Sequence, residues 1–169
     1  EKESYSLSLE DAEYTSGELS DYFVRLFDCY PFIAAEDVLA EEDWIAWQKM
    51  TARCAATHAK LKLIGDDLFV TNTARLQKGI DLKCANSVLI KPNQVGTLTE
   101  TLECIALAQK HKYAVAISHR SGETTDSFIA DLAIAVNAEF IKTGSTARGE
   151  RTAKYNRLIE IEQELHGDR

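Results

Sequence analysis

The sequence lacks three features: a long apolar run, an excess of basic residues and an initiator methionine. No stretch of about 18 apolar residues occurs, so we expect no membrane-spanning helix. The 19 basic residues stand against 27 acidic ones, a net charge of −8, which argues against a nucleic-acid-binding protein with a broad basic face. The first residues are charged and do not form a signal peptide, so we expect the chain to be a portion of a longer protein.

The four cysteines lack the spacing of a zinc or redox motif. Cys29, Cys54, Cys84 and Cys104 are separated by 25, 30 and 20 positions, and each has apolar neighbours. We expect them to be small buried hydrophobic residues in a reducing compartment. The cytoplasm is therefore the expected location, with an association at the cell surface left open.

The composition is that of a soluble globular domain. Hydrophobic residues make up 45% and charged residues 27% of 169 positions, which suffices for a substantial core and is not typical of disorder. Residues 1–14 form a polar, acidic segment without a strong period. We expect residues 1–169 to belong to a single domain.

Short apolar runs alternate with amphipathic helical patterns along the rest of the chain. The runs cover residues 32–35, 61–64, 87–90, 114–117 and 140–141. Continuous apolar runs are typical of parallel strands buried on both faces, and their alternation with helices predicts about five βα units.

Two helix starts carry a sequence signal of their own. Thr15 with Glu18, and Thr97 with Glu100, have the spacing of a capping box. The last helix is expected to carry its apolar face at Tyr155, Leu158, Ile159 and Leu165.

Two closures of an α/β sheet fit this pattern, an open doubly wound sheet and part of a (β/α)8 barrel. Each apolar run ends in polar residues, at positions 36, 66, 91, 118 and 142. Barrel active sites are assembled from the carboxyl ends of several strands, whereas an open sheet gathers its site at one switch point. The strand ends therefore favour the barrel.

Acidic residues end two of the predicted strands. Glu36 and Asp37 follow one run, and Asp66 and Asp67 follow the next. Carboxylates from neighbouring strands are suitable ligands for Mg²⁺, although acids before helices also serve as N-caps. We expect one acid of each pair to point inward and the other to serve its loop.

Lys91 ends the third predicted strand, and Pro92 should keep it extended. A lysine held out of water near metal ions loses its proton more readily and can act as a base. The alternative is an ordinary exposed lysine on a loop.

The densest polar cluster follows the fourth predicted strand. It contains Ser118, His119, Arg120 and Ser121, and Lys142 ends the next strand. Arginine suits phosphate or carboxylate, and phosphate sites in barrels often lie in the loops after the last two strands. Two polar loops with incidental basic residues are the alternative, and no Ser/His/Asp spacing supports His119 as the base of a nucleophile.

These residues make the chain resemble the enolase family from about Tyr30 to its C-terminus. The most specific match is the run Ser-His-Arg-Ser-Gly-Glu-Thr at 118–124. Further matches, in the order of the family, are residues 65–68, 70–72, 91, 93–96, 129–132, 141–144, 150–151 and 153–156. The chain departs from the family pattern at Val38, usually proline, and at Pro92, usually aliphatic.

The resemblance implies an Mg²⁺-dependent lyase of glycolysis that reversibly dehydrates 2-phosphoglycerate to phosphoenolpyruvate. Glu36 and Asp66 match metal ligands that also face the substrate, and Lys91 matches the base. The phosphate segment is matched by Ser118, His119, Arg120 and Ser121, and a carboxylate contact by Lys142. The fold implied is the C-terminal part of an enolase-type (β/α)8 barrel.

The same resemblance implies that other parts of the family's site lie upstream of this chain. These are a third metal carboxylate, the general-acid glutamates, the first barrel strands and a small N-terminal domain. Family members are usually homodimers. Two other functions fit the sequence: a different lyase of the enolase superfamily, and a binding or scaffold role without catalysis.

Overall fold

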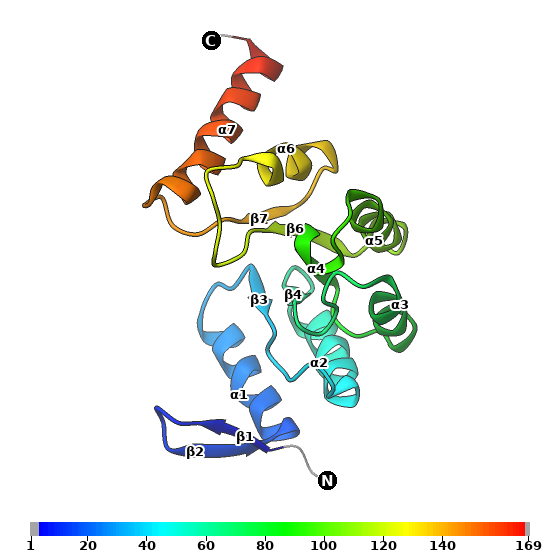
Figure 1. Ribbon diagram of the computed structural model, residues 1–169. Coiled ribbons are helices and arrows are strands. Elements are labelled where there is room, and N and C mark those ends of the chain that lie inside the picture. The colour runs from blue at the N-terminus through cyan, green and yellow to red at the C-terminus, as the bar shows by residue number, and fades with distance from the viewer. Residues whose placement is uncertain (1–3, 168–169) are drawn as a thin grey trace.

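The computed structural model describes residues 4–167, in which five parallel strands form one curled sheet (Figure 1). The strands are β3 (Ala34–Glu36), β4 (Lys62–Gly65), β5 (Ser87–Ile90), β6 (Ala114–Ser118) and β7 (Phe140–Lys142). They lie side by side in the order in which they occur along the chain. A doubly wound sheet would reverse its strand order at a switch point, so this topology confirms the barrel-type arrangement.

A helix follows each strand of the sheet, as the apolar periodicity predicts. These helices are α2 (Trp44–Thr57), α3 (Thr73–Leu82), α5 (Leu98–Lys110), α6 (Phe128–Ala135) and α7 (Gly149–His166). Helix α1 (Ser16–Cys29) precedes β3, and the short α4 (Pro92–Val95), which the periodicity does not predict, separates β5 from α5. Within residues 4–167 no helix is long and apolar enough to cross a membrane.

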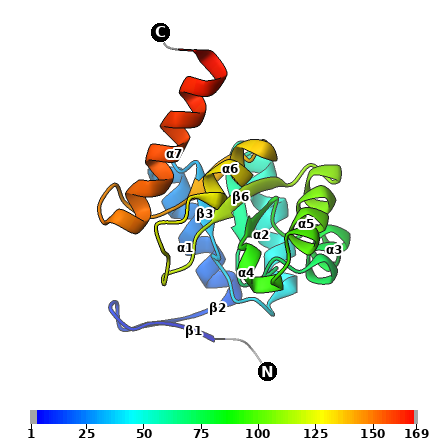
Figure 2. The ribbon, with the colours of Figure 1, turned by 45° about the horizontal axis from the view of Figure 1, so that its top comes forward.

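The two faces of the sheet differ in what packs against them. The main hydrophobic core joins one face to the helices, which lie around the outside of the strands in Figure 1. The other face carries a small cluster made only of strand residues: Ala34, Ile64, Leu89, Ala116 and Phe140. This second face is the inner surface of the partial barrel. Helix α7 contacts α6 and projects away from the sheet in both views (Figures 1 and 2).

Residues 4–14 are more structured than the composition of the polar entry segment suggests, and residues 1–3 of that segment lie outside the described residues. β1 (Ser4–Leu7) and β2 (Ala12–Thr15) form an antiparallel hairpin, whose four-residue strands are too short to give a clear period. The hydroxyl of Tyr5 accepts a hydrogen bond from the backbone N–H of Ala40 (3.1 Å) and donates one to Asp43 (3.0 Å). The hairpin is thereby tied to the loop between β3 and α2.

The helix starts agree with the sequence signals. Thr15 and Glu18 form the reciprocal capping box at the start of α1. At α5, the Thr97 hydroxyl oxygen accepts from the backbone N–H of Glu100 (3.2 Å) and its O–H donates to the Glu100 carboxylate (2.5 Å). Each pair satisfies a backbone donor that a helix start otherwise leaves free.

Three of the four cysteines are buried, as their apolar neighbours indicate. Burial raises the pKa of Cys84 to about 11 and that of Cys104 to about 12, and it raises the pKa of Cys54 as well. Cys29 is exposed at the last turn of α1, so the expectation of burial is wrong there. It follows Asp28 on the solvent side of the helix, which a count of apolar neighbours does not resolve.

Helix α3 packs so closely on Phe69 that Gly79 has no room for a side chain. A Cβ at Gly79 would lie 2.4 Å from a ring carbon of Phe69, whose side chain is fully buried. We expect Gly79→Ala to destabilise the chain by about 1–3 kcal/mol, since overpacking outweighs the gain in helix propensity. Urea unfolding measures this, with Gly17→Ala in α1 as the control, because a Cβ there meets nothing within 4 Å. Equal stability of both variants would contradict the close contact.

Candidate active site

One layer of side chains on the inner face of the sheet brings the strand-end residues together. Alternate residues of a strand point to the same face, and each member of the inner cluster is followed two positions later by a polar residue. In chain order these polar residues are Glu36, Asp66, Lys91, Ser118 and Lys142. Five residues that are far apart in sequence therefore share the carboxyl-terminal end of one surface, where barrel sites are built.

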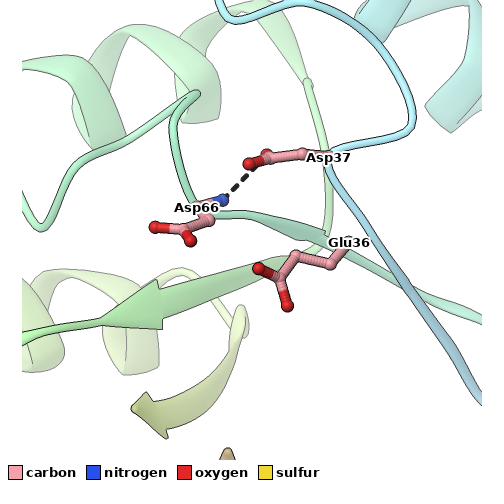
Figure 3. A group of neighbouring side chains, drawn as sticks. All are labelled: Glu36, Asp37 and Asp66. Carbon is pink, nitrogen blue, oxygen red and sulfur yellow. Dashed lines mark hydrogen bonds between the residues drawn. The ribbon is translucent and has the colours of Figure 1, made fainter. Parts of the chain in front are cut away.

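Three carboxylates converge at the ends of β3 and β4 (Figure 3). Glu36, Asp37 and Asp66 each offer an oxygen, and these oxygens lie within 4.8 Å of one another. The Oδ1 atom of Asp66 is buried and has no hydrogen-bond partner among the described residues. A buried acceptor left unpaired is costly, so this oxygen fits a group that a bound cation would satisfy.

Asp37 serves the neighbouring loop. Its carboxylate accepts hydrogen bonds from the backbone N–H groups of Asp66 and Asp67, at 2.9 Å each. Burial raises the pKa of Asp37, and these two hydrogen bonds offset part of that increase. Asp67 itself is exposed. Asp37 is thus held by the loop backbone, although one of its oxygens also lies within 4.8 Å of those of Glu36 and Asp66. The division into inward and loop-serving acids stays a prediction, with Glu36 and Asp66 as the expected inward pair.

Each inward carboxylate is paired with a lysine of the same layer. The Nζ atom of Lys91 lies 2.5 Å from Oδ2 of Asp66, and Nζ of Lys142 lies 2.5 Å from Oε1 of Glu36. The side chain of Lys91 is 14% exposed and that of Lys142 is 47% exposed. Lys91 is therefore a largely buried amine, and the prediction of an ordinary exposed loop lysine does not describe it.

The loop between β4 and α3 has an unusual backbone. Val70 and Thr71 have φ angles of 45° and 56°, in the left-handed region that β-branched residues avoid. Such conformations cost on the order of 1–3 kcal/mol each and persist only where the surroundings enforce them. The Thr71 side chain is fully buried and accepts a hydrogen bond from the backbone N–H of Lys91 (2.9 Å).

The predicted anion-binding segment lies in the loop after β6. Ser118 is buried at the strand end and is in register with Lys142, whereas Arg120 and Ser121 are exposed. The guanidinium of Arg120 donates to the side chain of Asn93 (3.2 Å). Among residues 4–167, Arg120 forms no ion pair with a carboxylate, so its charge faces solvent at the open end of the barrel.

His119 lies between this loop and the sheet. Burial lowers its pKa, and the cations of Arg151, Lys154 and Lys142 act in the same direction, against the opposing effect of Glu123. Its Nδ1 atom is buried without a partner among the described residues.

The family model for the enolase C-terminal TIM barrel domain matches residues 1–169. The chain belongs to the enolase family. It is 53% identical over 161 residues to an enolase of Sulfurimonas denitrificans and 55% identical over 161 residues to one of Rubrobacter xylanophilus. The matches cover 95% of this chain, but only 38% and 37% of those two enolases. The chain thus spans less than two fifths of the length of these relatives.

A buried lysine that the sequence predicts only as part of a matched segment, residues 153–156, fixes the loop after β6. Lys154 of α7 is fully buried, and its ammonium group donates to the carbonyls of Thr124 and Glu150, at 2.7 Å each. It also pairs with Glu123 at 2.8 Å, and Glu123 in turn accepts from the backbone N–H of Arg120 (3.2 Å).

The sequence alone does not reveal this role, because the role depends on which face of α7 is covered. Lys154 lies seven residues before Ile161, and these are the two buried residues of α7. Residues at i and i+7 share a helix face. A lysine on the face that a buried isoleucine occupies needs an acceptor, and acceptors are available in the loop that α7 covers.

Proposed function

We propose that this chain forms the C-terminal part of the active site of an enolase, a cytoplasmic enzyme that reversibly dehydrates 2-phosphoglycerate to phosphoenolpyruvate in glycolysis. One observation carries the proposal: a single inner layer places the Lys91 amine against Asp66 and the Lys142 amine against Glu36. A base, two carboxylates and an anion contact are the groups that proton abstraction beside a carboxylate requires.

Glu36 and Asp66 are the residues that would hold Mg²⁺. The unpaired, buried Oδ1 of Asp66 fits this role, and carboxylate oxygens are the ligands that Mg²⁺ prefers. When bound, the ion stabilises the negative charge that develops on the substrate carboxylate, as is typical of enolase-superfamily sites, which pair a lysine or histidine base with one or two Mg²⁺ ions.

Lys91 is the proposed base. In its neutral form its Nζ takes the proton from the carbon next to the substrate carboxylate, and the hydroxyl of the neighbouring carbon leaves as water with a proton from the general-acid glutamates expected upstream. The low exposure of 14% keeps competing water away. Lys142 lies one strand beyond Ser118 in the same layer, and in this proposal its ammonium group binds the substrate carboxylate. Both lysines then act on one end of the substrate.

The phosphate end of the substrate is assigned to the loop after β6. Arg120 presents a planar set of donors to solvent, and Ser118, His119 and Ser121 lie beside it in sequence. Arginine binds phosphate through paired, charge-assisted hydrogen bonds. In this proposal the substrate lies with its carboxylate on the strand ends and its phosphate on the loop.

The proposal extends to parts that the family places upstream: a third metal carboxylate, the general-acid glutamates and an N-terminal domain, in a homodimer. We therefore test it on the protein extended upstream to the length of its relatives (the extended protein), beside the 169-residue chain. We expect Mg²⁺-dependent formation of phosphoenolpyruvate, followed by its ultraviolet absorbance, from the extended protein alone. A folded, inactive extended protein in Mg²⁺ would refute the proposed reaction.

Asp66 and Asp67 provide a matched pair for testing the metal site. Removing a group that only orients a metal ligand lowers metal affinity about 10- to 100-fold, so we expect Asp66→Asn to raise the Mg²⁺ concentration needed for half-maximal activity by at least about 10-fold. Asp67→Asn should leave it unchanged, because the Asp67 side chain is exposed. Titration with Mg²⁺ measures both. Equal shifts in the two variants would exclude Asp66 as a specific ligand.

A further inference from the structure

The turn after β4 adopts a backbone conformation that its own residues disfavour. Val70 and Thr71 are consecutive, β-branched and left-handed, with φ angles of 45° and 56°. L-residues other than glycine, asparagine and aspartate rarely visit this region. Outliers of this kind cluster at functional sites, where the surrounding structure holds them in place. The strained turn therefore holds a side chain in a position that a relaxed turn would not give it.

The turn places the Thr71 hydroxyl within hydrogen-bond distance of the backbone N–H of Lys91. The Oγ1 atom accepts from the Lys91 N–H (2.9 Å) and its O–H donates to Oε1 of Gln94 (2.6 Å). The pairing of β5 with β6 ends at Ile90 and Ile117. The N–H of Lys91 therefore has its partner in a side chain and not in the sheet.

The same turn also starts at the carboxylate that faces Lys91. The backbone carbonyl of Asp66 accepts from the N–H of Val70 (2.7 Å) and from that of Phe69 (3.2 Å). The side chain of Asp66 lies 2.5 Å from Nζ of Lys91. Asp66 and Lys91 are therefore linked in two ways. The turn connects Asp66 to Thr71 and so to the backbone of Lys91, and the ion pair connects the two side chains directly.

We propose that Thr71 is a positioning residue that fixes the direction of the Lys91 amine, and that Gln94 orients the Thr71 hydroxyl so that an oxygen lone pair faces Lys91. The inference rests on the proposed role of Lys91 as the base. Thr71 acts only through Lys91 and touches no substrate. Its geometry explains why the chain keeps two left-handed β-branched residues at this point.

Three variants of the extended protein test this inference by kinetics. Thr71→Val keeps the shape and the β-branch but removes the hydroxyl, and we expect kcat to fall about 10- to 100-fold with little change in KM, since small misplacements of a reacting group have effects of this size. Thr71→Ser keeps the hydroxyl and should retain most of kcat. The control is Thr101→Val on α5, equally buried and donating to the Thr97 carbonyl, which should leave kcat unchanged.

A second measurement does not depend on activity. Hydrogen exchange of the backbone amide of Lys91, followed by mass spectrometry, should be about 5- to 10-fold faster in Thr71→Val, the equivalent of one lost hydrogen bond, and unchanged in Thr101→Val. If Thr71→Val does not fold, Gln94→Ala gives the same two readouts at a partly exposed position. If the extended protein is inactive but Thr71→Val still speeds the exchange at the Lys91 amide, the positioning role is supported and only the proposed reaction is overturned.

Two results would overturn the inference. One is unchanged exchange at Lys91 together with unchanged kcat in Thr71→Val. The other is an equal loss of kcat in Thr71→Val and Thr101→Val, which would show that any buried threonine matters equally and that the effect is one of packing.

Discussion

Replacing Lys91 by alanine is expected to lower the turnover of the extended protein by about 10²–10⁴-fold, the range that a positioned general base contributes. The reason is local. Nζ of Lys91 lies 2.5 Å from Asp66 and its side chain is 14% exposed, so bulk water has little access to the position of the proposed base. Exchange of the substrate α-proton with deuterated water, followed by NMR, should be lost in parallel with turnover.

Two controls separate this effect from a loss of structure. Lys110→Ala removes an exposed lysine at the end of α5 and should leave turnover unchanged. Lys91→Ala should still bind Mg²⁺, because its removal leaves the Asp66 carboxylate without a competing cation. A Lys91→Ala variant that turns over normally would show that the proton goes to another group.

Replacing Lys154 by methionine is expected to destabilise the extended protein by about 3 kcal/mol. Loss of one partner from a buried ion pair typically costs about 3–5 kcal/mol, and the lower value applies here because the Glu123 side chain keeps 20% exposure. Burial raises the pKa of Glu123, but its hydrogen bonds with Lys154 and the Arg120 backbone reverse this and keep the pKa below its ordinary value. Removing Lys154 leaves the Glu123 carboxylate without the cation that lowers its pKa. Urea unfolding measures the loss.

The chain offers a matched comparison in the pair formed by Lys62 and Glu139. The Nζ atom of Lys62 lies 3.1 Å from the Glu139 carboxylate, and the two side chains are 30% and 50% exposed, respectively. Exposed ion pairs contribute about 0–1 kcal/mol to stability. Lys62→Met should thus have little effect. Adding Glu123→Gln to Lys154→Met should recover part of the stability, since it removes the uncompensated charge. A Lys154→Met variant as stable as Lys62→Met would rule out the anchoring role of Lys154.

The sequence predicts the strands because each is a continuous apolar run, and it predicts the inward residues because each run ends in a polar residue. Glu36, Asp66 and Lys91 each lie at the end of an apolar run, and in parallel strands the carboxyl ends lie at one edge of the sheet. The resemblance to enolases added roles that this pattern alone leaves open. Pro92 behaves as expected from its ring, since Lys91 before it is extended, with φ −122° and ψ 101°.

The sequence does not predict which face of a helix is covered. In α7, Ile159 and Leu165 are 53% and 67% exposed, while Lys154 and Ile161 are buried. Tyr155 and Leu158 are partly buried, so the apolar face expected for the last helix is wrong at Ile159 and Leu165 only. The helix contacts α6, and Lys154 and Ile161 lie on the same helical face as Leu158 and Leu165. The role of Thr71 was equally hidden, because it depends on a positive φ angle and on a partner 20 positions away.

The left-handed turn also bears on efforts to make this protein more heat-resistant. Glycine is the residue that relaxes a backbone with positive φ, so a search for stabilising substitutions would select Thr71→Gly. That substitution would delete the hydroxyl that holds the backbone of Lys91. Stability and activity are therefore in conflict at a single side chain, and thermostabilisation should begin at sites outside residues 66–72.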